Sequence, residues 1–219
     1  MHQPFHTRFE QEEFDYQTLI DALKEYARPR DKITDLIRKG VIVRIKKGLY
    51  VLGQGYAQRP YSKELLANLI YGPSYISLDW ALRHYDMIPE RVEAVTSVTT
   101  GRSRRFVTPA GLFIYRNIPL TAFRYGMTQM ETEDGKTFLI ASAAKALCDK
   151  IRDDRGIGMR SIKEMQRYLT TELRMDERTL TALDPSQIEK IANGYQSAKL
   201  RLLKKYLDRL HRLNREGRP

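Results

Sequence analysis

The sequence has few of the residues that build covalent or metal-based sites. It contains a single cysteine, Cys148, and four histidines scattered along 219 residues. One cysteine excludes an intramolecular disulfide, and one cysteine with a few scattered histidines cannot build a tetrahedral structural zinc site. We therefore expect no metal, no cofactor and a reducing compartment.

The chain also lacks long apolar segments. No apolar run approaches the roughly 20 residues that span a bilayer. The N-terminus, MHQPFHTRFEQEEF, does not have the basic and then apolar layout of a signal peptide. These absences predict a cytoplasmic protein with no membrane partner.

Catalytic motifs are missing from the middle of the chain, Tyr61 to Asp149. This region has no glycine-rich phosphate loop, no Gly-x-Ser-x-Gly elbow and no His-x-x-x-His on a helix. His84 lies beside Tyr85 and Asp86, which could tune an imidazole, but a lone histidine at a helix end is more often structural. We expect no catalytic residue and no enzyme.

What the chain does have is basic charge at both ends. Its formal net charge is +11, and eight basic residues face two acidic ones between Arg28 and Lys47. A second excess of the same size lies between Lys199 and Arg218, and the middle is nearly neutral. This distribution favours a polyanionic partner.

The first basic segment has a regular pattern. Ile33, Leu36 and Ile37 recur at helical spacing, and Gly40 then ends the predicted helix. Alternating apolar residues follow from Val41, with a turn at Lys46-Lys47-Gly48. A first helix, capped by Asp15, carries an apolar stripe from Tyr16 to Ala27. Helix, turn, helix and basic hairpin predict a winged helix-turn-helix.

This motif assigns the candidate DNA contacts. A recognition helix lies in the major groove, and a wing approaches the phosphates. We expect base contacts from Lys32, Thr34, Asp35 and Arg38, and phosphate contacts from Arg28, Arg30, Lys39, Lys46 and Lys47. The alternative is a solvated basic face on a small helical module that docks protein.

Turn residues divide the rest of the chain. Gly53–Pro60 is the best linker candidate. Beyond it, Ser62, Ser77 and Ser142 are candidate helix caps around a small sheet of at least three strands. The last third predicts helices, ending in a long one capped by Asp184 with Gly194 as a weak point. We expect an α+β chain with domains at residues 1–53, 61–155 and 160–219.

Two further basic groups are candidate additions to the nucleic-acid surface. The first is the predicted hairpin turn with Arg102, Arg104 and Arg105, and the second is the terminal helix with Lys204, Lys205 and Arg209. Either group could instead meet an acidic protein. The arginine turn could also be a soluble hairpin tip, and the terminal helix could self-associate or lie along its own domain.

The phrases from Tyr61 to Asp149 resemble the second domain of the AbiEi-type antitoxins, the regulator halves of type IV toxin-antitoxin systems. The matching phrases are Tyr61–Leu82, Ile88–Val92, Thr96–Phe106, and FLIAS and KALCD between Phe138 and Asp149. The segment Asp31–Leu52 also resembles the family's winged helix. One departure is Ala143-Ala144, where the family usually has Pro-Glu.

The resemblance implies two roles. The winged helix would bind the promoter of its own operon and repress it, and the rest would counteract a nucleotidyltransferase-like toxin. It implies no catalytic residues. Ala143-Ala144 removes an acid from a helix N-terminus, where a carboxylate favours the helix dipole. The alternative function is a winged-helix transcriptional regulator with no toxin partner.

Overall fold

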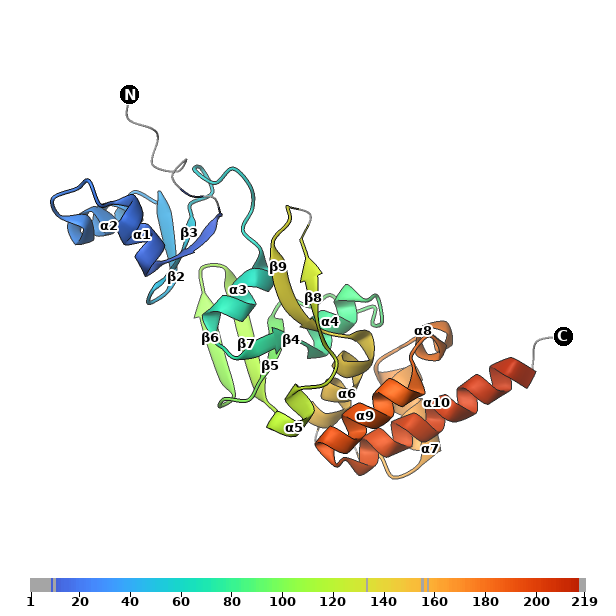
Figure 1. The fold of residues 1–219 in the computed structure, drawn as a ribbon. Helices are drawn as coiled ribbons and strands as arrows, with labels where there is room; N and C mark the ends of the chain where they lie inside the picture. Colours follow the sequence, from blue (N-terminus) through green and yellow to red (C-terminus); the bar gives the residue numbers. More distant parts are fainter. Residues whose placement is uncertain (1–8, 10, 133, 155, 157, 217–219) are drawn as a thin grey trace.

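The computed structural model of the protein describes residues 9, 11–132, 134–154, 156 and 158–216. These residues form helices and two β-sheets, one small and one large (Figure 1). The prediction of a mixed α+β chain is therefore confirmed.

Residues 11–52 form a small unit, which we call the N-terminal module. Its three strands pair antiparallel in the order β1-β3-β2. The elements are β1 (Glu13–Asp15), α1 (Tyr16–Ala22), α2 (Pro29–Arg38), β2 (Ile42–Lys46) and β3 (Leu49–Leu52). The predicted order of helix, turn, helix and hairpin is present. The sequence pattern does not predict β1, and α1 ends five residues before Ala27.

Local signals set the ends of these helices. The Asp15 carboxylate accepts a hydrogen bond from the Thr18 amide at 2.8 Å, as predicted for the cap of α1. Gly40 follows α2 with φ +68°, a left-handed conformation that glycine adopts without a Cβ penalty. The chain can therefore turn sharply from α2 into the hairpin.

The middle strand β3 is buried on both faces. Tyr50 and Leu52 pack with the core under α1 and α2, whereas Leu49 and Val51 belong to the core of the rest of the chain. Successive side chains of a strand point to opposite faces. The small sheet is thus packed between its own helices and the second part of the molecule.

The large sheet has six strands in the order β6-β7-β5-β4-β9-β8. Its strands are β4 (Ser74–Ile76), β5 (Val95–Thr99), β6 (Arg104–Thr108), β7 (Gly111–Asn117), β8 (Met127–Glu131) and β9 (Thr137–Ala141). The pairs β4/β9 and β5/β7 are parallel and the others antiparallel. The prediction of at least three strands is confirmed, and β6 lies at one edge.

Helices pack against this sheet (Figure 1). They are α3 (Lys63–Ile70), α4 (Leu78–His84), α5 (Leu120–Phe123) and α6 (Ala143–Asp153). Ser62 caps α3 and Ser142 caps α6 through their hydroxyl oxygens, as predicted. Ser77 precedes α4, but its hydroxyl donates to Asp149 at 2.6 Å and makes no cap hydrogen bond. Ser77 is therefore the N-cap residue of α4, as predicted, but its side chain does not cap the helix.

The C-terminal third is helical. It contains α7 (Ile162–Arg167), a π-helical turn (Tyr168–Glu172), α8 (Glu177–Thr181), α9 (Pro185–Tyr195) and α10 (Ala198–Glu216). The prediction of one continuous helix from Asp184 is wrong, because Gln196 takes a left-handed conformation and the chain reverses there. The apolar stripe is instead divided between α9 and α10, which pack against each other (Figure 1).

Gly194 lies where α9 approaches α5 closely. A Cβ at this position would be 2.8 Å from the Thr121 carbonyl oxygen. The Thr121 hydroxyl also donates to the Gly194 carbonyl at 2.7 Å. The glycine therefore permits a tight helix contact, which helical spacing in the sequence does not indicate.

Candidate nucleic-acid interface

The outward face of α2 is polar. Ile33 and Leu36 are buried on the opposite face, and Pro29 occupies the first turn, where its missing N–H is tolerated. Thr34 and Arg38 are exposed. The Thr34 hydroxyl donates back to the Arg30 carbonyl at 3.2 Å. The helix thus presents a charged surface of about three turns to solvent.

Asp35 is the acidic centre of this surface. Its carboxylate lies 2.9 Å from Lys39, 2.7 Å from Arg38 and 3.8 Å from Lys32. Hydrogen bonds from Lys39 and then Arg38 lower the pKa of Asp35 to about 2. The carboxylate therefore stays ionised at neutral pH and offsets part of the basic charge of α2.

The other basic residues predicted to contact DNA from this helix differ in the partners that they have within the chain. Arg28 lies 3.9 Å from Asp31 in a fully solvated pair, and the Lys32 ammonium lies 5.2 Å from the centre of the Tyr26 ring. Arg30 is exposed and has no ion pair within the described part of the chain. Unpaired or weakly paired cations of this kind can bind DNA phosphates in place of water.

The two lysines of the hairpin turn differ in their surroundings. The Lys46 ammonium donates to the Ile70 carbonyl at 2.5 Å, and burial lowers its pKa. Lys47 is exposed and unpaired among the described residues, and Gly48 makes the turn with φ +85°. Only Lys47 of this pair is directed to solvent.

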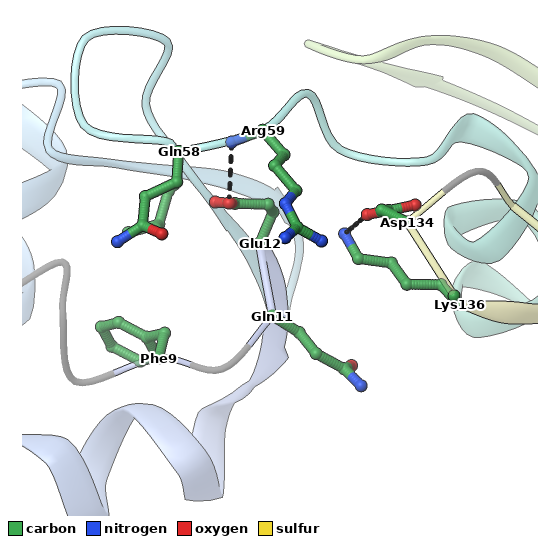
Figure 2. A pocket seen from close by; sticks show the side chains of 9 residues that line it. Phe9, Gln11, Glu12, Gln58, Arg59, Asp134 and Lys136 are labelled. Carbon is green, nitrogen blue, oxygen red and sulfur yellow. Dashed lines mark hydrogen bonds and ion pairs between the residues drawn. The ribbon is translucent and has the colours of Figure 1, made fainter.

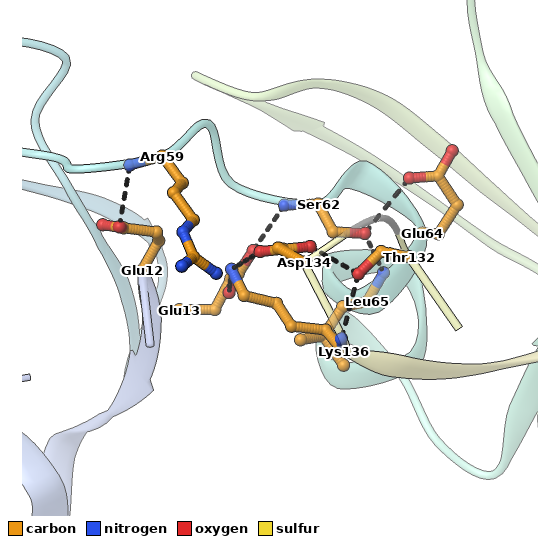
Figure 3. Close-up of polar contacts among 9 residues, drawn as sticks. All are labelled: Glu12, Glu13, Arg59, Ser62, Glu64, Leu65, Thr132, Asp134 and Lys136. Carbon is orange, nitrogen blue, oxygen red and sulfur yellow. Dashed lines mark hydrogen bonds and ion pairs between the residues drawn. The ribbon is translucent and has the colours of Figure 1, made fainter. Parts of the chain in front are cut away.

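A polar joint fixes the N-terminal module to the large sheet (Figure 3). The Glu13 side chain is fully buried and accepts from the Ser62 amide, and the Lys136 ammonium lies 2.9 Å from it. The Glu12 carboxylate accepts from the Arg59 amide at 3.0 Å. Two adjacent acids, Glu12 just before β1 and Glu13 at its first position, therefore hold both ends of the segment 59–62 and the turn after β8.

Lys136 is the cation of this joint. Burial alone would lower its pKa, but hydrogen bonds and charge from Glu13 and Asp134 outweigh burial and leave the pKa raised. Figure 2 shows the cavity of about 280 Å³ beside the joint, between Phe9 and Lys136. The contacts drawn within it, Glu12 to the Arg59 amide and Lys136 to Asp134, are those of the joint.

The two additional basic groups lie in different places. Arg102, Arg104 and Arg105 are exposed on or beside the edge strand β6. On α10, Lys204 pairs with Asp208 at 2.9 Å, whereas Lys205 and Arg209 are exposed. Figure 1 places α10 at the opposite end of the molecule from α2. The structure therefore does not bring the α10 group and α2 into one surface.

A buried ionic cluster is the feature that sequence reasoning does not find. Lys145 and Asp149 are in contact on α6 and nearly inaccessible to solvent. The Tyr195 hydroxyl donates to Asp149 at 2.5 Å, and Ser77 contacts its second oxygen. The i, i+4 spacing of the lysine and the aspartate is the one signal in the sequence. The cluster links α4, α6 and α9.

Cys148 lies in the same interior. Burial raises the pKa of its thiol well above the ordinary value, and the neighbouring Asp149 adds to this. Within the described residues, no group of three or more His, Cys, Asp or Glu side chains is placed to hold a metal ion.

No protein-family model and no curated protein matches the chain. No helix among the described residues is both long and apolar enough to cross a membrane.

Proposed function

We propose that the N-terminal module is a winged helix-turn-helix that binds double-stranded promoter DNA. In this proposal the chain is a cytoplasmic antitoxin that represses its own operon and counteracts a nucleotidyltransferase-like toxin. The observation that carries the DNA-binding role is the outward face of α2, whose polar side chains are exposed to solvent, and the hairpin adds the exposed cation Lys47.

The geometry supports a division of contacts. Thr34, Asp35 and Arg38 lie opposite the buried face of α2, where a recognition helix faces base edges. The flanking cations suit phosphates, and they are Arg28, Arg30, Lys39 and Lys47. Lys32, predicted from the sequence as a base contact, is assigned to phosphates here because its ammonium lies over the Tyr26 ring. Lys46 is left out of this set because its ammonium is held by the Ile70 carbonyl.

The toxin-countering role rests on the resemblance of Tyr61–Asp149 to AbiEi-type antitoxins. The structure offers one surface for such a partner on α10. Lys205 and Arg209 are exposed there, and Leu213 keeps 54% of its surface exposed. Direct contact with the toxin would use a surface remote from α2, so the two roles would be separable.

The test uses a triple alanine variant of Arg38, Lys39 and Lys47. Its matched control replaces three exposed cations elsewhere, Arg91, Lys163 and Arg178, and removes the same charge. Promoter binding is measured by fluorescence anisotropy, and protection by growth during co-expression of the toxin encoded next to the chain. We expect the triple variant to lose promoter binding and keep protection.

Two results would contradict the proposal. Promoter binding by the triple variant at the level of the control would remove the DNA-binding role of α2. Loss of protection by a triple variant with an unchanged melting curve would show that the two roles are not separate.

A further inference from the structure

We propose that the DNA-binding surface continues from the hairpin tip onto the large sheet, where Arg104 of β6 contacts a backbone phosphate. This inference rests on the proposed DNA-binding function. It extends the interface beyond the N-terminal module to the edge of a second sheet.

The contacts of α3 make the two surfaces adjacent. The Lys46 ammonium at the hairpin tip is bound to the carbonyl of Ile70, the last residue of α3. The Arg104 guanidinium lies over the ring of the next residue, Tyr71, at 5.8 Å from its centre. Ile70 and Tyr71 are consecutive in the chain. One contacts Lys46 at the hairpin tip, next to the exposed Lys47, and the other contacts Arg104 of β6. Figure 1 shows the tip of the β2–β3 hairpin directed toward α3 and β6.

Arg104 rests on a fixed aromatic surface. The Tyr71 ring packs against Tyr115 and Phe106, with ring centres 5.3 Å and 5.9 Å away. Gly101 passes so close to Tyr71 that a Cβ there would lie 2.6 Å from the Tyr71 hydroxyl. A guanidinium held over an aromatic ring by a cation–π contact loses less rotamer freedom on binding.

The loop before β6 is also held in place. The Asn117 side chain donates to the carbonyls of Thr100 and Gly101, and the Asn117 amide donates to the Ser103 hydroxyl. Arg102 therefore extends from a loop tied to the neighbouring strand. Cations that are already held in place lose little conformational entropy when they bind a ligand.

The arginines of this edge are not neutralised. Arg102, Arg104 and Arg105 are exposed and make no ion pair among the residues described, whereas Arg38 and Lys39 of α2 share Asp35. Charged side chains on an edge strand also discourage strand pairing between molecules. That role needs charge alone and does not account for the position of Arg104 over Tyr71 beside the hairpin tip.

The pleat of β6 separates its two arginines. Arg104 pairs with Tyr115 and shares the sheet face of Phe106, on which Tyr115 reaches Ala67 of α3. Arg105 pairs with Ile114 and points to the other face. Arg104 thus lies on the face that carries α3 and the hairpin tip, and Arg105 is a control of equal charge on the same strand.

Duplex DNA is the occupant that this placement favours. A phosphate accepts two parallel N–H bonds from a guanidinium, and its contact is independent of base sequence. An acidic protein would be attracted by the same arginines, but it would have no need for continuity with the hairpin tip. The two partners are therefore distinguished by whether Arg104 and Lys47 act on the same ligand.

The experiment compares Arg104→Ala with Arg105→Ala on two duplexes from the promoter of the chain's operon. One duplex is the shortest that binds, and the other extends it by about ten base pairs, or one helical turn, at each end. We expect Arg104→Ala to weaken binding of the longer duplex about three- to tenfold and to reduce the salt slope by about 0.9, the value for one phosphate. Arg105→Ala should bind like the wild type.

The outcomes separate the inference from the proposed function. Wild-type affinity of Arg104→Ala for both duplexes, or equal losses in the two arginine variants, would overturn the inference. Loss of toxin binding by Arg104→Ala with DNA affinity unchanged would assign the edge to a protein partner and also overturn it. If the α2 triple variant also binds normally, the proposed function itself fails.

Discussion

At the residue scale, Asp35 controls how much basic charge α2 offers. Its carboxylate holds Arg38 and Lys39 at hydrogen-bond distance, so both cations are oriented along the helix surface. Because the pKa of Asp35 is lowered to about 2, mild acid does not release them. High salt, a competing anion or a mutation of Asp35 would release these two side chains.

We predict that Asp35→Asn raises non-specific DNA affinity and lowers specificity. The released Arg38 and Lys39 would engage phosphates, so affinity for random-sequence duplex should rise about three- to tenfold at low salt, with a steeper salt dependence. Asp31→Asn removes the same charge from the same helix, but within the described residues the ion pair of Asp31 is a solvated one with Arg28. Equal effects of the two variants in anisotropy titrations would contradict the role of Asp35.

Lys46 and Lys47 show why single residues are hard to assign from sequence. Both precede a turn glycine, and a pattern of basic turn residues predicts the same role for each. Lys46 is distinguished by the Ile70 carbonyl, 24 residues away in the chain. Contacts between distant segments are not encoded in local spacing.

At the element scale, the contact of β1 with the large sheet depends on the Glu13–Lys136 pair. Neutralising the carboxylate of a buried ion pair lowers stability strongly, because the cation stays buried without its partner charge. We predict that Glu13→Gln lowers the free energy of unfolding by about 2 to 4 kcal/mol in urea titrations. Glu131→Gln, on the exposed strand β8, should change it by less than about 0.5 kcal/mol.

A double-mutant cycle with Lys136→Met gives the control for this prediction. Removal of both charges should restore part of the stability lost in Glu13→Gln, because the buried ammonium, left with Asp134 as its remaining acidic partner, is gone. Additive losses in the double variant would show that the pair is not coupled.

At this scale, the sequence predicts the helix caps but not the short strands. Asp15, Ser62 and Ser142 are read correctly because a cap and its amide partner lie within three residues of each other. The short strands β1 and β4 have no alternating pattern of their own and exist through pairing with distant strands. The break at Gln196 is missed because the apolar stripe continues through it.

At the scale of the whole molecule, acid should destabilise the fold. Among the residues that the structure describes, hydrogen bonds and ion pairs lower the pKa of six carboxyl groups, which are Asp15, Asp35, Glu90, Asp134, Glu164 and Asp184. A group with a lowered folded-state pKa stabilises the protein above its unfolded pKa, and this stabilisation is lost as pH falls through the folded value. The unfolded values lie near 4.

We therefore predict a fall in the urea midpoint below about pH 4.5, continuing toward pH 2, and little change between pH 5 and 8. The net charge of +11 adds repulsion as the carboxylates are protonated. A midpoint that stays constant from pH 7 to pH 3 would contradict this account. Added salt should reduce the part due to repulsion.

The candidate interface as a whole was only partly predictable. Local pattern and charge predict the polar outward face of α2 and the exposed Lys47, because these depend on one helix and one turn. The adjacency of the hairpin tip to Arg104 depends on how two sheets pack through α3, and the sequence contains no local signal for it. The position of α10, which carries Lys204, Lys205 and Arg209, at the opposite end of the molecule from α2 is likewise a result of the tertiary fold.

The most direct test of the account is the salt dependence of binding to duplex DNA from the operon's promoter. Anisotropy titrations at several salt concentrations should give a linear plot of log K against log salt for the wild type. For the Arg38, Lys39 and Lys47 triple alanine variant we predict an affinity at least about tenfold lower and a slope smaller by about 2 to 3. A variant with the wild-type affinity and slope would contradict the proposal that α2 and the hairpin bind DNA.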